Sequence, residues 1–398
     1  MRSNSQDEAV QRDGMLVSST MKMEMKTLSN KTTKSTKDNQ SFKMTEMLKL
    51  KSPADFIGKQ GNGVISFGSG QPDLPPPQEA FQGIDLTRDL RYGLIQGEVK
   101  LRESLAREYP GSTAENFVIT NGASEALDLI FRGWSKGEKV LLPRPYYYSY
   151  LPIIELAGMV PVFTDLVDGR IDLDDFKKKI KDCRAVLINS PSNPTGRVEA
   201  IETLKEIEKI TQKLGVYVVS DEVYKDLIYE RENYHINGDH VITVNSFSKT
   251  YCMCGVRVGY LWSSDKKVVE NVCEMKTHTS MNTNLVGQDM ALSAMRAPKE
   301  YIAKQQQIWR QRRDYIYKGL VDLGFDLWKP EGAFYVLPKC KNAREFLSVL
   351  YNDFKVITYL GEWFGAPDRI RLSYALDISQ IEEGLGRIRK AMQKVAVL

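Results

Sequence analysis

The feature that most constrains the fold is an alternation of short apolar runs with helical stretches, which starts near Gln78. The apolar runs, rich in Val, Ile and Tyr, are Phe117–Thr120, Val140–Leu142, Val160–Phe163, Ala185–Ile188, Val216–Val219, Val241–Val244 and Val258–Leu261. Helical stretches such as Glu98–Glu108, Ser124–Trp134 and Ile201–Leu214 lie among them. Near-continuous apolar strands spaced by helices are typical of a parallel sheet covered on both faces. We therefore predict an α/β fold whose large domain holds a mostly parallel seven-stranded sheet.

The pattern changes after Thr283, which predicts a second, smaller domain. A long polar-rich helical stretch runs to about Leu323, followed by strand-like Ala333–Leu337, a helix near Ala343–Tyr351 and strand-like Ile370–Tyr374, with a final helix behind them. This mixture indicates a smaller α+β domain joined to the first by a long helix. The predicted parts are an N-terminal arm of the small domain at 44–77, the large domain at 78–285, and the linking helix with the small C-terminal domain at 286–398.

Residues 1–43 have a different composition. They are rich in Ser, Thr, Lys, Asn, Gln and Met and show no sustained apolar period. Such a segment buries too little surface to offset its ordering entropy, which predicts a disordered tail. An upstream alternative start codon explains the composition equally well.

Composition and charge exclude several classes of partner. The 398 residues carry a net charge of +4, which gives no reason to expect nucleic acid or a membrane surface as partner. No apolar run approaches the roughly 18 to 20 residues of a membrane-spanning helix, and the N-terminus has no apolar core of a secretory signal. Five cysteines without regular spacing and three histidines favour neither a disulfide framework nor a metal site. We therefore expect a cytoplasmic protein without a metal.

Polar signatures follow four of the predicted strands or their loops. They are Asn121–Glu125, Asn189–Gly196, Asp221–Tyr224 and Ser246–Lys249. Ligands of open α/β sheets sit beyond the carboxyl ends of the strands. Four such loops at one edge of the sheet therefore predict a ligand site there.

Lys249 and its surroundings carry the strongest chemical signal. A catalytic amine must lose its proton near neutral pH, and desolvation with nearby positive charge achieves this. Ser246, Ser248 and Arg257 are donors suited to a phosphate. The start of a helix at Gly122-Ala123-Ser124 also favours an anion, although a simple helix cap explains it equally well. A solvated loop lysine is the alternative for Lys249.

Further polar residues have both a functional and a structural explanation. Asp221 at a buried strand end needs a partner, which is a protonated ring nitrogen, an ordinary salt bridge or the start of a helix that it caps. Arg371 in a strand with apolar neighbours needs an anion, either a substrate carboxylate or a structural partner. Asn193 lies in a turn by composition. A tyrosine of Tyr146–Tyr148 could stack on a flat cofactor, and these tyrosines and Tyr224 could equally belong to the core.

Together these residues resemble the fold-type-I, class I/II aminotransferases that depend on pyridoxal phosphate, the aspartate-aminotransferase-like family. The resemblance covers about Val64 to the C-terminus. It is carried by Ser-x-Ser-Lys-(x)7-Arg-x-Gly at Ser246–Gly259, by Asn-Pro-Thr-Gly from Asn193, and by Asp-Glu-Val-Tyr from Asp221.

The resemblance implies pyridoxal 5'-phosphate as the cofactor and assigns a role to each matching residue. The implied cofactor-binding residues are Tyr92, Ala123, Ser124, Tyr147, Asn193, Asp221, Tyr224, Ser246, Ser248, Lys249 and Arg257. The implied substrate-binding residues are Gly70, Asn193 and Arg371. Lys249 matches the catalytic lysine that forms the Schiff base and moves the proton between Cα and C4′ of the cofactor.

The other implied roles concern the cofactor ring, its phosphate and the substrate. Asp221 matches the partner of the pyridine nitrogen, and Asn193 and Tyr224 match the partners of the phenolic oxygen. Tyr147 matches the stacking aromatic residue. Tyr92 resembles a tyrosine that the neighbouring subunit lends to the phosphate, which implies a homodimer with shared active sites. The phosphate binders are Ala123, Ser124, Ser246, Ser248 and Arg257, and the carboxylate binder is Arg371.

The implied reaction is a ping-pong transfer of the amino group of an L-amino acid to a 2-oxo acid, with 2-oxoglutarate as the expected acceptor and a role in amino acid metabolism. The donor stays open among aspartate, alanine, glutamate and aromatic amino acids. A β-lyase or another enzyme of the same fold is the alternative. A ligand sensor would need a DNA-binding module, and the sequence shows no signature of one. A dehydrogenase would need a Gly-x-Gly-x-x-Gly turn, which the sequence also lacks.

Two positions depart from the family pattern. Cys254 replaces the usual Thr before the glycine of the lysine segment, and Leu360 stands where a Pro-Gly turn is common. We expect neither to touch a proposed chemical group.

Overall fold

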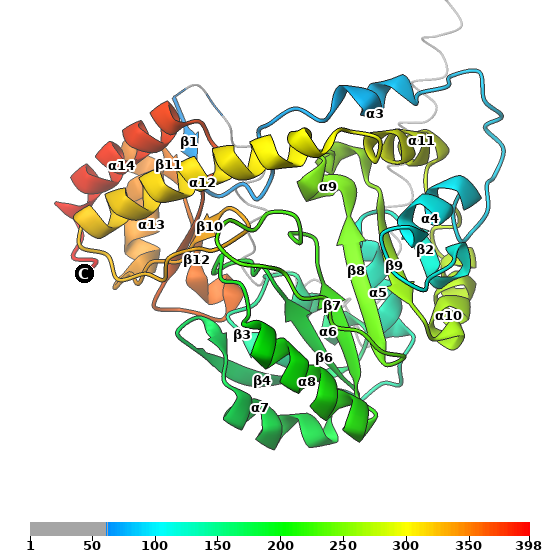
Figure 1. Ribbon diagram of the computed structural model, residues 1–398. Helices are drawn as coiled ribbons and strands as arrows, with labels where there is room; N and C mark the ends of the chain where they lie inside the picture. Colours follow the sequence, from blue (N-terminus) through cyan, green and yellow to red (C-terminus); the bar gives the residue numbers. More distant parts are fainter. Residues whose placement is uncertain (1–60, 62) are drawn as a thin grey trace, which may run out of the picture. The chain divides into compact units, whose positions relative to one another are not determined.

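An eight-stranded sheet lies at the centre of the part of the chain that the computed structural model describes, residue 61 and residues 63–398 (Figure 1). Its order is β2-β9-β8-β7-β6-β3-β4-β5. The strands are β2 Phe117–Thr120, β3 Lys139–Arg144, β4 Val160–Val167, β5 Arg170–Ile171, β6 Ala185–Asn189, β7 Tyr217–Asp221, β8 Val241–Ser246 and β9 Gly259–Ser263. The predicted tail, and the predicted arm up to residue 60, lie outside the described residues.

The pairing of the strands confirms the predicted fold class. The pairings from β8 through β7, β6 and β3 to β4 are all parallel, whereas β9 is antiparallel to both of its neighbours. All seven predicted runs are strands of this sheet. The eighth strand, β5, was not predicted, because its two residues are too few to show a pattern.

Side chains of one strand alternate between two apolar layers, which explains why the runs are apolar throughout. In β3, Val140 and Leu142 pack with α5 (Ala123–Arg132), α6 (Tyr150–Leu156) and α10 (Lys266–Thr277), whereas Leu141 packs on the opposite face. That face is covered by α7 (Leu173–Lys179) and α8 (Ile201–Leu214) (Figure 1). Burying each such side chain contributes about 1.5–3 kcal/mol, so the two layers hold the sheet edge rigid.

A second group of elements consists of β1, which precedes the sheet in sequence, and of elements that follow the sheet. Its strands are β1 Ile65–Ser66, β10 Tyr335–Val336, β11 Val356–Ile357, β12 Tyr359–Leu360 and β13 Ile370–Ser373. β1 pairs in parallel with β11, and β13 pairs antiparallel with β10 and β12. Their core contains Trp309 of α12 (Lys299–Asp322), Phe346 of α13 (Ala343–Phe354) and Ile388 of α14 (Ile378–Met392). The boundaries drawn at residues 77 and 285 stay a prediction.

The long helical stretch predicted after Thr283 is two helices. α11 spans Leu285–Ala294, and α12 begins after Pro298. Proline has no N–H to donate to the preceding turn, which explains the break at this position. The remaining α-helices of the described residues are α3 Gln78–Gln82, α4 Val99–Ala106 and α9 Phe247–Thr250. Within residues 61 and 63–398, no helix is long and apolar enough to cross a membrane.

Candidate active site

The carboxyl ends of β2, β6, β7 and β8 meet at one edge of the sheet, beside a cavity of about 530 Å³. Every predicted site residue except Tyr92 lines this cavity: Gly70, Ala123, Ser124, Tyr147, Asn193, Asp221, Tyr224, Ser246, Ser248, Lys249, Arg257 and Arg371. The four loops therefore come together as the strand pattern predicts.

Lys249 lies in the short helix α9, Phe247–Thr250, which is capped by Ser246, the last residue of β8. Its Nζ donates to the carbonyl oxygen of Gly70 at 2.6 Å and lies 4.0 Å from Cys254 Sγ. Within the described residues Lys249 has no carboxylate partner. Removal from water lowers the pKa of the Lys249 amine, and the guanidinium groups of Arg371 and Arg257 lower it further. The alternative of a solvated loop lysine does not fit this environment.

One end of the cavity is suited to an anion. α5 begins after Gly122 without a side-chain cap. No side chain of the described residues therefore caps the N–H groups at the start of this helix, which lies at the edge of the cavity. Ser246 Oγ and Ser248 Oγ lie 2.8 Å apart beside it. Arg257 reaches the same place, and a Cβ at Gly122 would lie 2.3 Å from Arg257 Nη2. Glycine is therefore required for the guanidinium to approach the helix start.

Asp221 lies at the end of β7 and is 4% exposed. Its Oδ2 accepts a hydrogen bond from Tyr150 Oη at 2.6 Å, and its Oδ1 accepts one from Val223 N at 3.2 Å. Burial raises the pKa of Asp221 to about 6. No lysine, arginine or histidine of the described residues pairs with this carboxylate. The salt bridge considered from the sequence is therefore not what the structure contains.

Asn193 and Tyr224 lie between these groups. Asn193 N donates to Asn189 Oδ1 at 2.8 Å, and Asn193 Oδ1 accepts from Arg371 Nη1 at 3.3 Å. Tyr224 Oη lies 2.8 Å from Tyr335 Oη. The polar ends of both side chains are thus held by neighbours at the cavity wall.

Arg371 is 1% exposed in β13. Its Nη2 donates to the carbonyl oxygen of Gly68, its Nε has no hydrogen-bond partner, and its Cζ lies 4.7 Å from the ring centroids of both Tyr335 and Tyr359. No aspartate or glutamate of residues 61 and 63–398 pairs with it. A buried guanidinium without a carboxylate is costly unless an anion binds to it.

Comparisons with known proteins agree with this geometry. Residues 62–388 match the family model of aminotransferase class I and II. The chain belongs to this family. A probable aspartate/prephenate aminotransferase of Aquifex aeolicus is 33% identical over 89% of this chain and 97% of the relative. The predicted aspartate-aminotransferase-like family is therefore confirmed, and the protein is an aminotransferase.

Solved structures of aminotransferases have the same fold. The crystal structure of aspartate aminotransferase from Thermotoga maritima has a TM-score of 0.80 and 31% identity, covering 88% of this chain and 96% of that one. The aromatic aminotransferase of Pyrococcus horikoshii has a TM-score of 0.79 and 28% identity, and the match covers 86% of this chain and 99% of that one.

Tyr92 lies away from the cavity of this aminotransferase. Its side chain is 81% exposed, in a surface groove that Arg88, Glu98 and Leu285 also line. The described chain therefore does not bring Tyr92 to its own Lys249.

The expectation that Cys254 touches no proposed chemical group is wrong. The turn after α9 folds back, so that Cys254 Sγ donates to the carbonyl oxygen of Ser248 at 3.1 Å and lies 4.0 Å from Lys249 Nζ. Cys254 also lines the cavity. Leu360, the other departure, is buried in β12 and is not part of the cavity lining.

Several lining residues of the aminotransferase were not predicted from the sequence. They are Ser66, Ser69, Gln71, Leu127, Tyr148, Tyr150, Asn189, Val223, Tyr335 and Tyr359. Two had a usable signal: Tyr150 follows Tyr147 by three residues, close to one helical turn, and Asn189 comes directly after the predicted strand Ala185–Ile188. Six more lie within four residues of a predicted site residue, namely Ser66, Ser69, Gln71, Leu127, Tyr148 and Val223. Tyr335 and Tyr359 come from segments distant in sequence, which a local pattern does not connect.

Proposed function

We propose that this aminotransferase uses pyridoxal phosphate and that Lys249 binds it. The observation that carries the proposal is the position of the Lys249 amine, in one cavity with an anion-binding end and a buried carboxylate without a cationic partner. The residues fit the group. The space at Gly122 accommodates Arg257 beside a phosphate, and a protonated ring nitrogen would compensate the buried charge of Asp221.

Each residue toward the cofactor has a defined task. The first N–H groups of α5, with Ser246, Ser248 and Arg257, bind the phosphate. Asp221 keeps the ring nitrogen protonated, and Asn193 and Tyr224 donate to the phenolic oxygen. When bound, the cofactor supplies an electron sink for the charge that develops at the substrate Cα.

The substrate is oriented and deprotonated by residues of the chain. Arg371 binds the α-carboxylate with two parallel hydrogen bonds, near the backbone of Gly70. With the cofactor bound, the Lys249 amine would remove the proton from the substrate Cα and return it to C4′ of the cofactor. The same residues then act in the reverse direction on a second 2-oxo acid, for which 2-oxoglutarate is the proposed acceptor.

The test is the substitution Lys249→Ala. Purified parent protein should be yellow, and the variant should bind the cofactor but lose transamination by several orders of magnitude, because one side chain supplies both the covalent link and the proton transfer. The exposed Lys267→Ala is the matched control and should retain parental turnover. Near-normal turnover of Lys249→Ala would refute the assignment. Pyruvate and ammonia formed without a 2-oxo acid would favour the β-lyase, and a panel of donors with 2-oxoglutarate identifies the amino donor.

We further propose a cytoplasmic homodimer with shared active sites. Tyr92 lies in a segment whose large apolar side chains are unusually exposed, among them Leu86 at 78% and Leu90 at 70%. Clustered exposed apolar residues mark interaction surfaces. Such a surface, next to a tyrosine that does not reach its own cavity, supports delivery of Tyr92 to the cavity of a second copy.

Complementation tests the shared site. Tyr92→Ala chains, impaired by loss of a hydrogen bond to a charged group worth about 1.5–3 kcal/mol, are refolded together with Lys249→Ala chains. In a mixed dimer one site contains both Lys249 and Tyr92, so activity should exceed the sum of the separate variants. If both residues serve one site within one chain, mixing restores nothing. Mixed dimers that form but fail to complement would contradict the proposal.

A further inference from the structure

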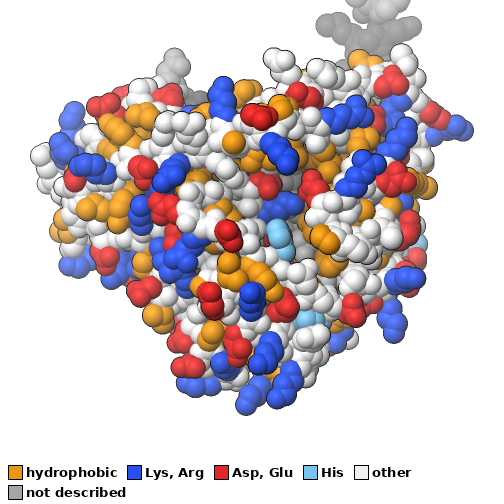
Figure 2. All heavy atoms as spheres, viewed as in Figure 1, with side chains coloured by type: hydrophobic (Ala, Val, Ile, Leu, Met, Phe, Trp, Pro, Cys, Tyr) orange, Lys and Arg blue, Asp and Glu red, His pale blue; other side chains and the backbone are white. Residues whose placement is uncertain are grey.

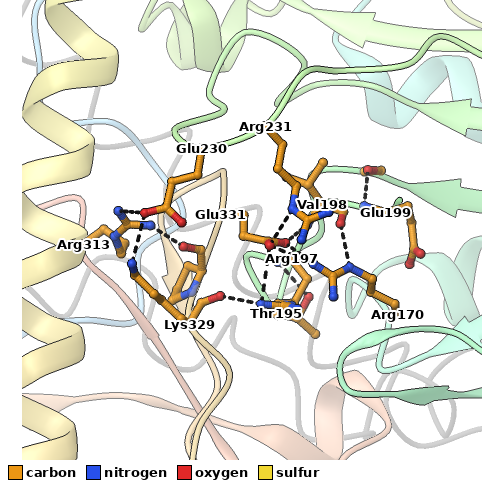
Figure 3. A network of polar contacts seen from close by, with 12 residues as sticks. Arg170, Thr195, Arg197, Val198, Glu199, Glu230, Arg231, Arg313, Lys329 and Glu331 are labelled. Carbon is orange, nitrogen blue, oxygen red and sulfur yellow. Dashed lines mark hydrogen bonds and ion pairs between the residues drawn. The ribbon is translucent and has the colours of Figure 1, made fainter. Parts of the chain in front are cut away.

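Glu331 lies outside the cavity, at the centre of a second cluster of charged residues (Figure 3). Its side chain is 8% exposed, and its Oε1 lies 2.7 Å from both Arg170 Nη2 and Arg231 Nε. Arg197 Nη1 is 3.7 Å from the same oxygen. One buried carboxylate therefore pairs with three guanidinium groups.

The same residue is bonded to the turn that begins with Asn193. Its backbone N–H donates to the carbonyl oxygen of Gly196 at 2.7 Å, and its Oε2 accepts from Val198 N at 3.2 Å. Gly196 has a φ of +67°, and a Cβ there would lie 2.6 Å from the carbonyl oxygen of Tyr335. Residues 193–198, called here the 193–198 turn, are thus packed directly on the segment from Glu331 to Tyr335.

Both ends of this contact reach the candidate active site. Asn193 accepts a hydrogen bond from Arg371, and Tyr335 lies beside Tyr224 at the cavity wall. A displacement of the 193–198 turn would therefore move the amide that the proposed function directs at the cofactor.

We propose that Glu331 is a positioning residue, which holds the 193–198 turn against the strand of Tyr335 through its ion pairs and its bond to Val198. The negative charge of Glu331 is needed for this role, because without it the three guanidinium groups around the turn would repel one another. The inference rests on the proposed function only for the role of Asn193 toward the cofactor.

Amide hydrogen exchange of the cofactor-free protein tests the proposal directly. Glu331→Gln keeps the size of the side chain and the backbone bond to Gly196 but removes the charge. Exchange in peptides covering residues 192–198 should rise about tenfold, while peptides of β7 and β8 stay at parental rates. Glu230→Gln is the matched control, because Glu230 pairs with Arg313 and Lys329 in the same region but makes no bond to the 193–198 turn (Figure 3).

The contrary outcomes are distinct. Parental exchange in Glu331→Gln, or an equal rise in all peptides, would overturn the positioning role. If Glu331→Gln does not fold, the substitution Arg231→Gln at a partly exposed arginine is the alternative test. The proposal then requires a smaller rise in amide exchange that is confined to residues 192–198, and parental exchange in these residues overturns it.

A spectroscopic readout connects the turn to the cofactor. In the loaded protein, Glu331→Gln should shift the pH midpoint of the visible absorbance upward, in the direction of Asn193→Ala, because a donor to the phenolic oxygen is displaced. Glu230→Gln should keep the parental midpoint. A parental midpoint in Glu331→Gln would argue against positioning. A colourless parent would instead contradict the proposed cofactor, and the exchange experiment would still decide the role of Glu331.

Discussion

Arginines lie in two regions of this aminotransferase that differ in their electrostatics. Arg371 has no carboxylate partner in the described part of the chain, and its Nε makes no hydrogen bond. Arg170, Arg197 and Arg231 instead share the carboxylate of Glu331. Each guanidinium group near Glu331 thus has an anionic partner within the chain, whereas Arg371 has none in the described residues. A buried charge without its counterpart therefore distinguishes a binding group from a structural one.

The cavity also contains a buried negative charge without a cationic partner among the described residues, the carboxylate of Asp221. Asp221 is buried without a cation, although Arg371 and Lys249 line the same cavity. No ion pair joins Asp221 to either of them. The fold keeps these opposite charges apart, so each can meet a separate group of a ligand.

The largest expected effect on stability is that of Glu331→Gln. Removing one partner of a buried ion cluster costs about 3–5 kcal/mol in the free energy of unfolding. Arg371→Met should cost clearly less, because it removes a charge without a carboxylate partner. Urea denaturation of the two variants without cofactor measures both values. Equal losses would contradict the difference drawn between the two regions.

A pH dependence follows from Asp221. Burial raises the pKa of Asp221 from its ordinary value of 3.8 to about 6, so the folded state binds this proton more tightly than the unfolded state. Stability therefore falls as pH rises from about 4 to about 6, by about 3 kcal/mol from two pKa units, and then stays level. Asp221→Asn should stabilise the cofactor-free protein by this amount above pH 6 and by almost nothing near pH 4. A difference that is the same at pH 4 and pH 8 would show that Asp221 is not the source.

The smallest expected effect is that of Arg371→Lys. Lysine keeps the charge but loses the two parallel hydrogen bonds, so KM for both the amino acid and the 2-oxo acid should rise about tenfold. Steady-state kinetics with each substrate varied in turn measures the effect. Unchanged KM values would place the substrate carboxylate elsewhere.

The sequence predicted the sheet and most of the cavity because both depend on short-range patterns. Apolar strands spaced by helices imply parallel pairing, and parallel pairing brings the loops of Asn193, Asp221 and Lys249 to one edge. The place of Tyr335 in the cavity wall was not predicted, because its contact with Tyr224 joins segments 111 residues apart. The contact of Cys254 with the site was not predicted, because its position depends on how the turn after α9 folds back. Strand β5 was not predicted, because two residues are too few to show a period.

The reversed direction of β9 has a consequence for the motif around Lys249. Ser246 pairs with Gly259 across β8 and β9, and Thr120 of β2 pairs with Gly259 from the other side. The hairpin thus leaves the sheet edge at Ser246, presents Lys249, and returns with Arg257 to the same edge. The number of residues between Lys249 and Arg257 therefore sets the distance between an amine and an anion-binding group. An insertion in this loop would alter the size of ligand that both can reach at once, although neither side chain had changed.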